Sequence, residues 1–185
     1  MSMAEITDEE IVAKVQNGDI ESFGILMKRY ESKLTRYGTK FMSNRDDIKD
    51  LVQEVFIKVY VNIKSFDLKQ RFSPWIYRIA HNEYINAVKK KKLKPLIFFD
   101  ADEIFPHPIA NETADSDTND RELRETLGKC LDKLDMKYRE VLVLYYFEQL
   151  GYEEIAEVLH IPASTVGVRL SRGKAMFKEL FKKLN

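Results

Sequence analysis

Aromatic, amide and cationic side chains alternate through residues 66–94, FDLKQRFSPWIYRIAHNEYINAVKKKKLK. Rings stack on any base, amides bind base edges and cations hold phosphates, so this combination suits unpaired nucleic acid. An ordinary amphipathic helix with an aromatic core and a solvated basic end would show the same pattern. For Trp75, a place in the core also remains open. The residues that we predict to contact nucleic acid here are Phe66, Asp67, Lys69, Arg71, Phe72, Trp75, Arg78, Asn82, Asn86, Lys89 and Lys90.

A helix must position these side chains. Ser73 followed by Pro74 predicts an N-cap and a first helical position. From there the apolar spacing predicts that Ile76, Ile79, Ala80, Ile85 and Val88 face inward. Tyr77 is left among the outward residues. The run Lys89–Lys92 closes the segment.

Three further helices precede this one. Thr7 and Glu10 predict a capping box, and Gly18 closes the first helix. The second is expected from Ile20 to Met42 and the third from Asp46 to Lys64. The inner stripes are expected to include Phe23, Leu26, Met27, Tyr30, Leu34, Tyr37 and Phe41 in the second helix, and Ile48, Leu51, Val52, Val55, Phe56, Val59, Tyr60 and Ile63 in the third. Four helices around one core predict a bundle.

The C-terminal segment shows a second helical pattern. Leu123 to Leu134 predicts one helix, and Asp135 caps another in which Tyr138, Val141, Leu142, Leu144 and Tyr145 are largely buried. Tyr152–Leu159, a turn at His160–Ile161 and a last helix from Pro162 or Ser164 to Leu184 follow, with Leu184 on the inner side. Two helices joined by a tight turn, the second of which carries exposed basic side chains, fit a helix-turn-helix. A plain helical scaffold with a basic end is the alternative.

Charge divides the chain although the totals balance, at 30 basic and 30 acidic residues. Residues 1–94 carry 18 Lys/Arg and 13 Asp/Glu, residues 95–120 carry none and seven, and residues 121–185 carry 12 and 10. Prolines and small polar residues also mark 95–120 as a linker. We therefore expect an all-α protein with two small helical domains, 1–94 and 121–185, joined by a flexible acidic linker.

Catalytic, metal and cofactor signatures are missing from the sequence. His81, His107 and His160 lie in separate segments, and neither a glycine-rich phosphate loop nor a nucleophile signature is present. Cys130 lies among leucines and is expected in the core. We expect no enzyme activity, no metal and no cofactor. Without a signal peptide or a long apolar run, we expect a cytoplasmic protein with no membrane span.

An acidic and amide patch lies on the outer face of the third helix, at Asp47, Asp50, Gln53 and Glu54. Such a patch could dock a basic partner, and a solvated face is the alternative.

Four stretches together resemble the sigma-70 family, specifically its short extracytoplasmic-function (ECF, group 4) class. Residues 50–60, DLVQEVFIKVY, resemble region 2.2, and residues 66–92 resemble regions 2.3 and 2.4. Residues 150–159, LGYEEIAEVL, resemble the first helix of the region 4 helix-turn-helix, and 161–172 its recognition helix. The likeness covers nearly the whole chain, and its strength lies in four ordered motifs with correct spacing.

The resemblance implies an RNA polymerase sigma factor that recognises the −35 and −10 promoter elements and melts the promoter. Residues 1–94 would form region 2, in which the aromatic and basic set above meets the −10 element and the loop Phe66–Phe72 receives a flipped base. The implied polymerase-binding residues are Asp47, Asp50, Leu51, Gln53, Glu54 and Phe56. Residues 121–185 would form region 4, with −35 contacts at Ser164, Thr165, Val168, Arg169, Ser171, Arg172 and Lys174. The implied partners are core RNA polymerase (β′ clamp and β flap) and promoter DNA, with an anti-sigma factor possible.

One departure concerns −35 recognition. After Thr165-Val166 the family usually has a basic and then a small polar residue, whereas this chain has Gly167 and Val168. Val168 can still touch a thymine methyl. We expect recognition to depend on Arg169, Ser171, Arg172 and Lys174 or on groove shape.

Two other function classes remain open from the residues alone. One is a stand-alone helix-turn-helix regulator whose first lobe senses or dimerises, and copurification with core polymerase separates it from a sigma factor. The other is an enzyme acting on nucleic acid, which the missing acid-base and metal sets disfavour.

Overall fold

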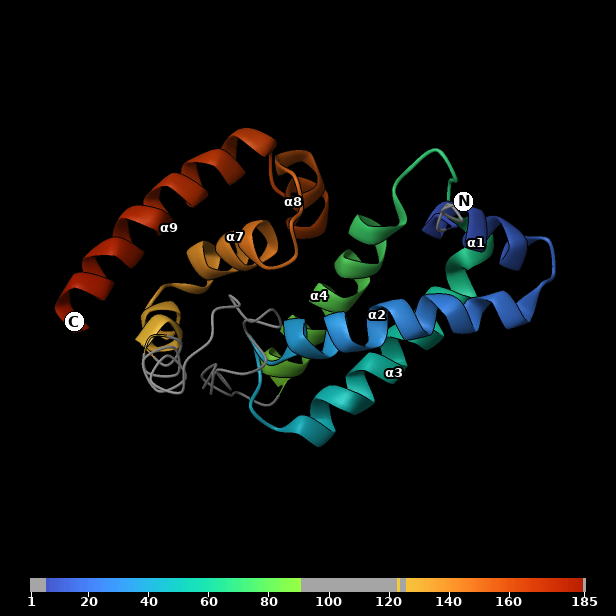
Figure 1. Ribbon diagram of the computed structural model, residues 1–185, viewed down its shortest axis with the longest axis horizontal. Coiled ribbons are helices and arrows are strands. Elements are labelled where there is room, and N and C mark those ends of the chain that lie inside the picture. The colour runs from blue at the N-terminus through green and yellow to red at the C-terminus, as the bar shows by residue number, and fades with distance from the viewer. Residues whose placement is uncertain (1–5, 91–122, 124–125, 185) are drawn as a thin grey trace, which may run out of the picture.

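The computed structural model describes residues 6–90, 123 and 126–184, and every regular element in them is a helix (Figure 1). The all-α prediction is confirmed. The N-terminal lobe contains α1 Asp8–Gln16, α2 Phe23–Gly38, α3 Arg45–Asn62 and α4 Phe72–Lys90, with 3-10 turns at Ile20–Ser22 and Ile63–Ser65. The C-terminal lobe contains a helical stretch at 126–132, then α7 Met136–Tyr146, α8 Tyr152–Leu159 and α9 Ala163–Leu184. The predicted linker, 95–120, lies outside the described residues, as do Lys91 and Lys92.

The N-terminal lobe is a bundle with an aromatic-rich core. α1 begins at the predicted capping box, where Glu10 N donates to Thr7 Oγ1 (3.2 Å) and Thr7 N donates to Glu10 Oε2 (2.8 Å). Tyr30, Tyr37 and Tyr84 are buried at the centre. The buried Tyr84 hydroxyl donates to the Leu34 carbonyl (2.9 Å), so the polar end of the ring is satisfied.

Several helix boundaries in this lobe differ from the sequence expectation. α2 ends at Gly38 rather than Met42, and α3 ends at Asn62 rather than Lys64. The second helix opens as a 3-10 turn at Ile20–Ser22, where Asp19 accepts a hydrogen bond from Ser22 N (3.2 Å). The fourth helix begins at Phe72 rather than after a Ser73 cap, and Phe72 N donates to Glu9 Oε1 of α1 (2.8 Å). A carboxylate from another helix supplies the acceptor that Ser73 was expected to supply.

Four residues predicted to face inward lie at the surface instead. Met27 is 40% exposed, Tyr60 41%, Tyr145 37% and Leu184 38%. The ring of Tyr60 still packs edge-on to Phe23, at 5.2 Å between centroids. These side chains lie at the borders of apolar stripes, where a helical period does not decide between contact and exposure.

The C-terminal lobe has helix-turn-helix geometry. His160 follows α8, and its left-handed backbone (φ 52°, ψ 46°) turns the chain sharply before α9. Ile155, Val158, Val166 and Leu170 are buried between the two helices. Cys130 is also buried, as expected. The first helix of the motif has the predicted bounds, and the second begins at Ala163.

The two lobes pack against each other through α4 and α8, which lie side by side in Figure 1. α1 and the C-terminal end of α9 lie on opposite sides of the molecule (Figure 1). α4 is therefore shared: it belongs to the core of the first lobe and forms the surface on which the second lobe rests.

Gly38 and Gly24, both in α2, form a matched pair for a stability test. A Cβ at Gly38 would meet Ile48 Cγ2 at 2.8 Å and Tyr84 Cζ at 3.2 Å, whereas a Cβ at Gly24 would meet nothing within 4 Å. We expect Gly38→Ala to lower the free energy of unfolding by about 1–2 kcal/mol, because overpacking outweighs the helix-propensity gain. Gly24→Ala should raise it by up to about 1 kcal/mol. Urea unfolding of both variants measures this, and equal effects of the two changes would contradict the close α2–α3–α4 packing.

Candidate nucleic-acid interface

α4 carries a stripe of polar and aromatic side chains along one outward face. Trp75, Arg78, Asn82, Asn86 and Lys89 follow at intervals of three or four residues, the spacing that aligns side chains on a helix. The first two are half-buried and the other three exposed, and Lys90 beside them is exposed too. The structure thus aligns six of the predicted −10 residues as one surface.

The two phenylalanines of the loop before α4, which the resemblance implies would receive a flipped base, are buried in this structure. Phe66 is 6% and Phe72 0% exposed. The centroids of these two rings lie 5.8 Å apart in an edge-on arrangement, and the Trp75 ring lies 5.0 Å from that of Phe66. The three rings therefore pack against one another. Apolar rings gain more from this cluster than from exposure in a loop. In this conformation neither phenylalanine offers a face to a base.

The polar residues of the same loop point outward. Asp67, Lys69 and Arg71 are exposed, and Asp67 Oδ1 accepts from Lys69 N (3.0 Å) to fix the turn. The loop thus presents one acid and two cations beside the N-terminus of α4.

Tyr77 was predicted to face outward and is only 2% exposed. Its hydroxyl donates to Glu148, a residue of the C-terminal lobe. Burial, followed by the nearby Glu148 carboxylate, raises the pKa of Tyr77 well above its usual value. The ring also packs edge-on to Tyr30 and Tyr37 of α2, at 6.4 and 5.4 Å between centroids, so both lobes contact Tyr77.

A groove of about 540 Å³ runs between α3 and α4. Asp47, Asp50, Leu51 and Glu54 line one side, all from the predicted polymerase-binding set, and Glu83 and Ala87 contribute to the other. Asn86 and Lys90, from the predicted −10 set, also line it. Two residue sets identified separately in the sequence therefore meet at one groove.

Phe56 departs from the rest of the polymerase-binding set. It is 5% exposed, and its ring packs edge-on to Phe23 with centroids 6.4 Å apart. Its side chain belongs to the core because α3 turns this position toward α2. Gln53 is exposed on the same helix.

The outward face of α9 presents most of the predicted −35 residues. Ser164, Val168, Ser171, Arg172 and Lys174 are exposed. Thr165 and Arg169 are half-buried. Burial raises the pKa of Glu140 to about 7, and the nearby Arg169 guanidinium opposes that rise. Arg169 therefore also serves an inward electrostatic role.

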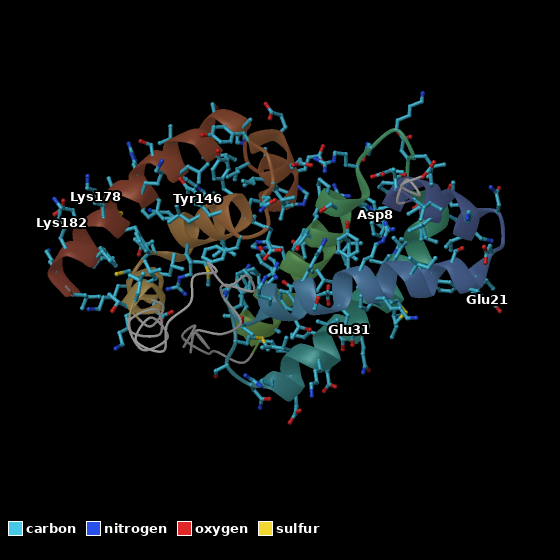
Figure 2. The ribbon with its side chains drawn as sticks, viewed as in Figure 1. Asp8, Glu21, Glu31, Tyr146, Lys178 and Lys182 are labelled. Carbon is cyan, nitrogen blue, oxygen red and sulfur yellow. The ribbon has the colours of Figure 1, made fainter. Side chains whose placement is uncertain are left out.

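Beyond these residues the basic character of α9 continues to its end. Lys178 and Lys182 extend away from the body of the lobe (Figure 2). No group of three or more His, Cys, Asp or Glu suited to a metal ion occurs within residues 6–90 and 126–184. None of the helices in those ranges is long and apolar enough to span a bilayer.

Two family profiles match this chain in the order that its lobes follow. Residues 26–93 match sigma-70 region 2, and residues 124–177 match sigma-70 region 4. The chain is 35% identical over 178 residues to the ECF RNA polymerase sigma factor SigW of Bacillus subtilis, which covers 91% of this chain and 94% of that protein. It belongs to the ECF class of sigma-70 factors.

Other relatives agree with this assignment. The ECF RNA polymerase sigma-E factor of Haemophilus influenzae is 33% identical over 183 residues, with 95% of this chain and 96% of that protein covered. In fold, the sigma factor resembles RpoE from Bartonella quintana, solved in complex with the anti-sigma factor NepR. The TM-score is 0.65 and the identity 22%, over 88% of this chain and 98% of that one. As a sigma factor, the protein acts in transcription initiation and is not an enzyme.

The lobe interface of this sigma factor is built around a buried carboxylate that the sequence analysis missed. The side chain of Glu148 is 1% exposed. Its Oε2 accepts from Arg36 Nη2 of α2 (3.1 Å) and from the Tyr77 hydroxyl of α4. Arg71 also pairs with Glu154 across the lobes, which engages one of the predicted −10 cations. These partners lie 71 to 112 positions apart, so no local pattern could have indicated them.

Three tyrosines beside α9 were also not singled out as functional. Tyr145, Tyr146 and Tyr152 are all exposed and pack ring to ring at the junction of α7 and α8. Tyr146 lies on α7 (Figure 2). Exposed aromatic clusters are unusual on a surface, and that exposure is the signal that could have found them.

Proposed function

We propose that this sigma factor divides its work between its lobes. Residues 1–94 bind core polymerase and the −10 element, residues 121–185 bind the −35 element, and residues 95–120 connect them. The matched ranges 26–93 and 124–177 support these boundaries. The net charge of −7 in the connecting segment, with seven acidic and no basic residues, suits a path through a basic channel of the polymerase.

The observation that carries the −10 assignment is the outward stripe of α4. Asn82 and Asn86 have amides that can hydrogen-bond to the edges of unpaired bases, and Lys89 and Lys90 can hold phosphates. Unstacking a base costs a few kcal/mol, which contacts in a pocket must offset. Because Phe66 and Phe72 are buried, we assign the contacts with the unstacked base first to the exposed groups of the loop and to Trp75.

For the −35 element, the assignment follows the exposure of α9. Ser171 and Arg172 can reach base edges in a major groove, and Val168 can contact a thymine methyl. Lys174 meets the phosphate backbone. Arg169 contributes less to base recognition than a fully exposed arginine would, because it also lies near the buried Glu140.

The proposed partners are the β′ clamp, the β flap and an anti-sigma factor. The acidic rim of the α3–α4 groove complements a basic surface, which suits the clamp. An anti-sigma partner is proposed because the fold relative from Bartonella quintana is solved with one.

Run-off transcription tests the function directly. Core polymerase is incubated with genomic promoter fragments in the presence and absence of the protein. We expect initiation at a defined set of promoters only in its presence. If core polymerase binds the protein and no fragment is transcribed, promoter recognition by this chain is disproved.

The groove assignment has a separate test. We expect Glu54→Gln to weaken binding to core polymerase by about 5- to 10-fold, because an exposed charge at an interface edge contributes about 1 kcal/mol. Glu31→Gln on α2, also an exposed glutamate, is the matched control and should change nothing. Fluorescence titration of labelled protein with core polymerase measures both. Equal affinities for the two variants would move the clamp site away from this groove.

A further inference from the structure

A small hollow lies between the end of α7, the start of α8 and the middle of α9. The rings of Tyr145 and Tyr146 lie 4.9 Å apart, and those of Tyr145 and Tyr152 lie 5.6 Å apart. The hollow has a volume of about 230 Å³. Its lining consists of Tyr145, Tyr146, Tyr152, Gly167, Leu170, Ser171 and Lys174.

All the polar side chains that line the hollow are hydrogen-bond donors. Three phenols, the Ser171 hydroxyl and the Lys174 ammonium surround the hollow, and no carboxylate is among the described residues that line it. Lys174 Nζ lies 5.9 Å from the centre of the Tyr146 ring. The interaction with Tyr146 raises the pKa of Lys174. The chemistry favours an anion with several acceptor oxygens.

Gly167 keeps the hollow open. A Cβ at this position would lie 3.5 Å from Tyr152 Cε2 and 3.9 Å from Cδ2, which is ordinary contact. A methyl group would fit, whereas a longer side chain would enter the space that the tyrosines enclose. Glycine inside an exposed helix lowers the stability of that helix by about 1 kcal/mol relative to alanine. We therefore expect Gly167 to have a function that offsets this loss.

The hollow also adjoins the groove-facing side of α9. Ser171 lines the hollow and is exposed next to Arg172, and Gly167 precedes the exposed Val168. A helix that enters the major groove places such a flank against the sugar-phosphate backbone.

We infer that the hollow formed by Tyr145, Tyr146, Tyr152, Ser171 and Lys174 seats one backbone phosphate of the upstream duplex, with the Tyr152 hydroxyl as a donor. The inference rests on the proposed −35 role of the C-terminal lobe and names a contact within it. Gly167 is the position that leaves room for this phosphate. The contact fixes the register of α9 on the duplex and is independent of base sequence.

A thermodynamic cycle between protein and DNA tests the contact. Polymerase containing the full-length sigma factor binds promoter fragments in which single phosphates of the −35 region are replaced by methylphosphonates. For the wild-type protein, we expect one position at which the replacement weakens binding about ten-fold, since hydrogen bonds to charged groups are the stronger class. Tyr152→Phe should weaken binding to the natural fragment, and the replacement at that position should then have little further effect.

Two further variants support the cycle. Tyr138→Phe removes a tyrosine hydroxyl from the same lobe outside the hollow, and it should leave the profile of methylphosphonate effects unchanged. Gly167→Leu fills the hollow and should abolish the same single-position effect. Thermal unfolding of each variant checks that the lobe remains folded.

Each outcome decides the inference. If the loss of binding free energy from Tyr152→Phe adds to the loss from every methylphosphonate, the phosphate seat is disproved. It is also disproved if no single methylphosphonate position weakens binding of the wild type more than the others. If the wild-type polymerase binds no fragment at all, the failure belongs to the proposed promoter function, and the two failures are therefore distinguishable.

Discussion

Arg36→Met is expected to separate the two lobes of the free sigma factor. Arg36 and Glu148 form an ion pair at 3.1 Å, in which the glutamate side chain is 1% and the arginine 19% exposed. Removing one partner leaves a buried carboxylate without its counter-charge, which costs about 3–5 kcal/mol. We expect about 3 kcal/mol here, because Arg36 retains some exposure. The ratio of docked to separated lobes should therefore fall by about 100-fold.

Fluorescence energy transfer measures this opening. Gln70 and Glu153 are exposed and adjacent in sequence to the Arg71–Glu154 pair, so dyes on cysteines at these two positions report lobe contact. Cys130 is buried and should not compete for the dyes. We expect high transfer for the wild type and low transfer for Arg36→Met.

The matched control removes the other arginine that crosses the interface. The side chain of Arg71 is 71% exposed, and exposed pairs contribute about 0–1 kcal/mol, so Arg71→Met should leave the lobes docked. Adding Glu148→Gln to Arg36→Met removes the stranded charge and should restore most of the transfer. If Arg36→Met alone keeps wild-type transfer, Glu148 does not hold the lobes together.

Sequence reasoning succeeded where the signal was local. The bounds of α8 and the capping box at Thr7 and Glu10 depend on neighbours within one helical turn, and both were predicted. Periodicity likewise placed Ile76, Ala80 and Val88 in the core of the first lobe.

It failed where a side chain has partners far away in the chain. Phe66 and Phe72 have the composition of a base-stacking loop, yet they pack with Trp75 because rings from a loop and a helix meet in space. Tyr77 was expected to face outward, yet its ring packs against Tyr30 and Tyr37 of α2 and its hydroxyl donates to Glu148 of the other lobe. A hydrophobic period reveals which face is apolar, and it does not reveal which other element covers a polar one.

His81 should make stability depend on pH between about 4 and 6.5. The residue is 9% exposed, and its Nδ1 lies 3.0 Å from the Tyr37 hydroxyl. Burial lowers the pKa of His81 from 6.5 to about 4, with smaller contributions from His160 and Lys89. The unfolded chain therefore binds a proton that the folded chain excludes in this range. The stability from neutral His81 is complete above pH 6.5 and is lost as the pH falls toward 4.

The size of the effect follows from the shift. The lowered pKa of His81 reduces the free energy of unfolding by about 2 kcal/mol at pH 5 relative to pH 7.5, because each pH unit below 6.5 costs about 1.4 kcal/mol. Two carboxyls act in the opposite direction, because burial raises the pKa of Asp132 to about 6 and that of Glu140 to about 7. Their folded forms hold protons that the unfolded chain releases, so their contribution grows as the pH falls. The wild-type curve alone therefore understates the contribution of His81.

Comparison with His81→Gln isolates the histidine, since glutamine is polar and does not titrate. We expect the difference in unfolding free energy between the two proteins to shift by about 2 kcal/mol against the wild type from pH 7.5 to pH 5, as measured by urea unfolding. Asp132→Asn, which removes one opposing group, should steepen the loss of stability on acidification. If the wild type and His81→Gln have the same pH dependence, the fold does not hold His81 neutral in this range.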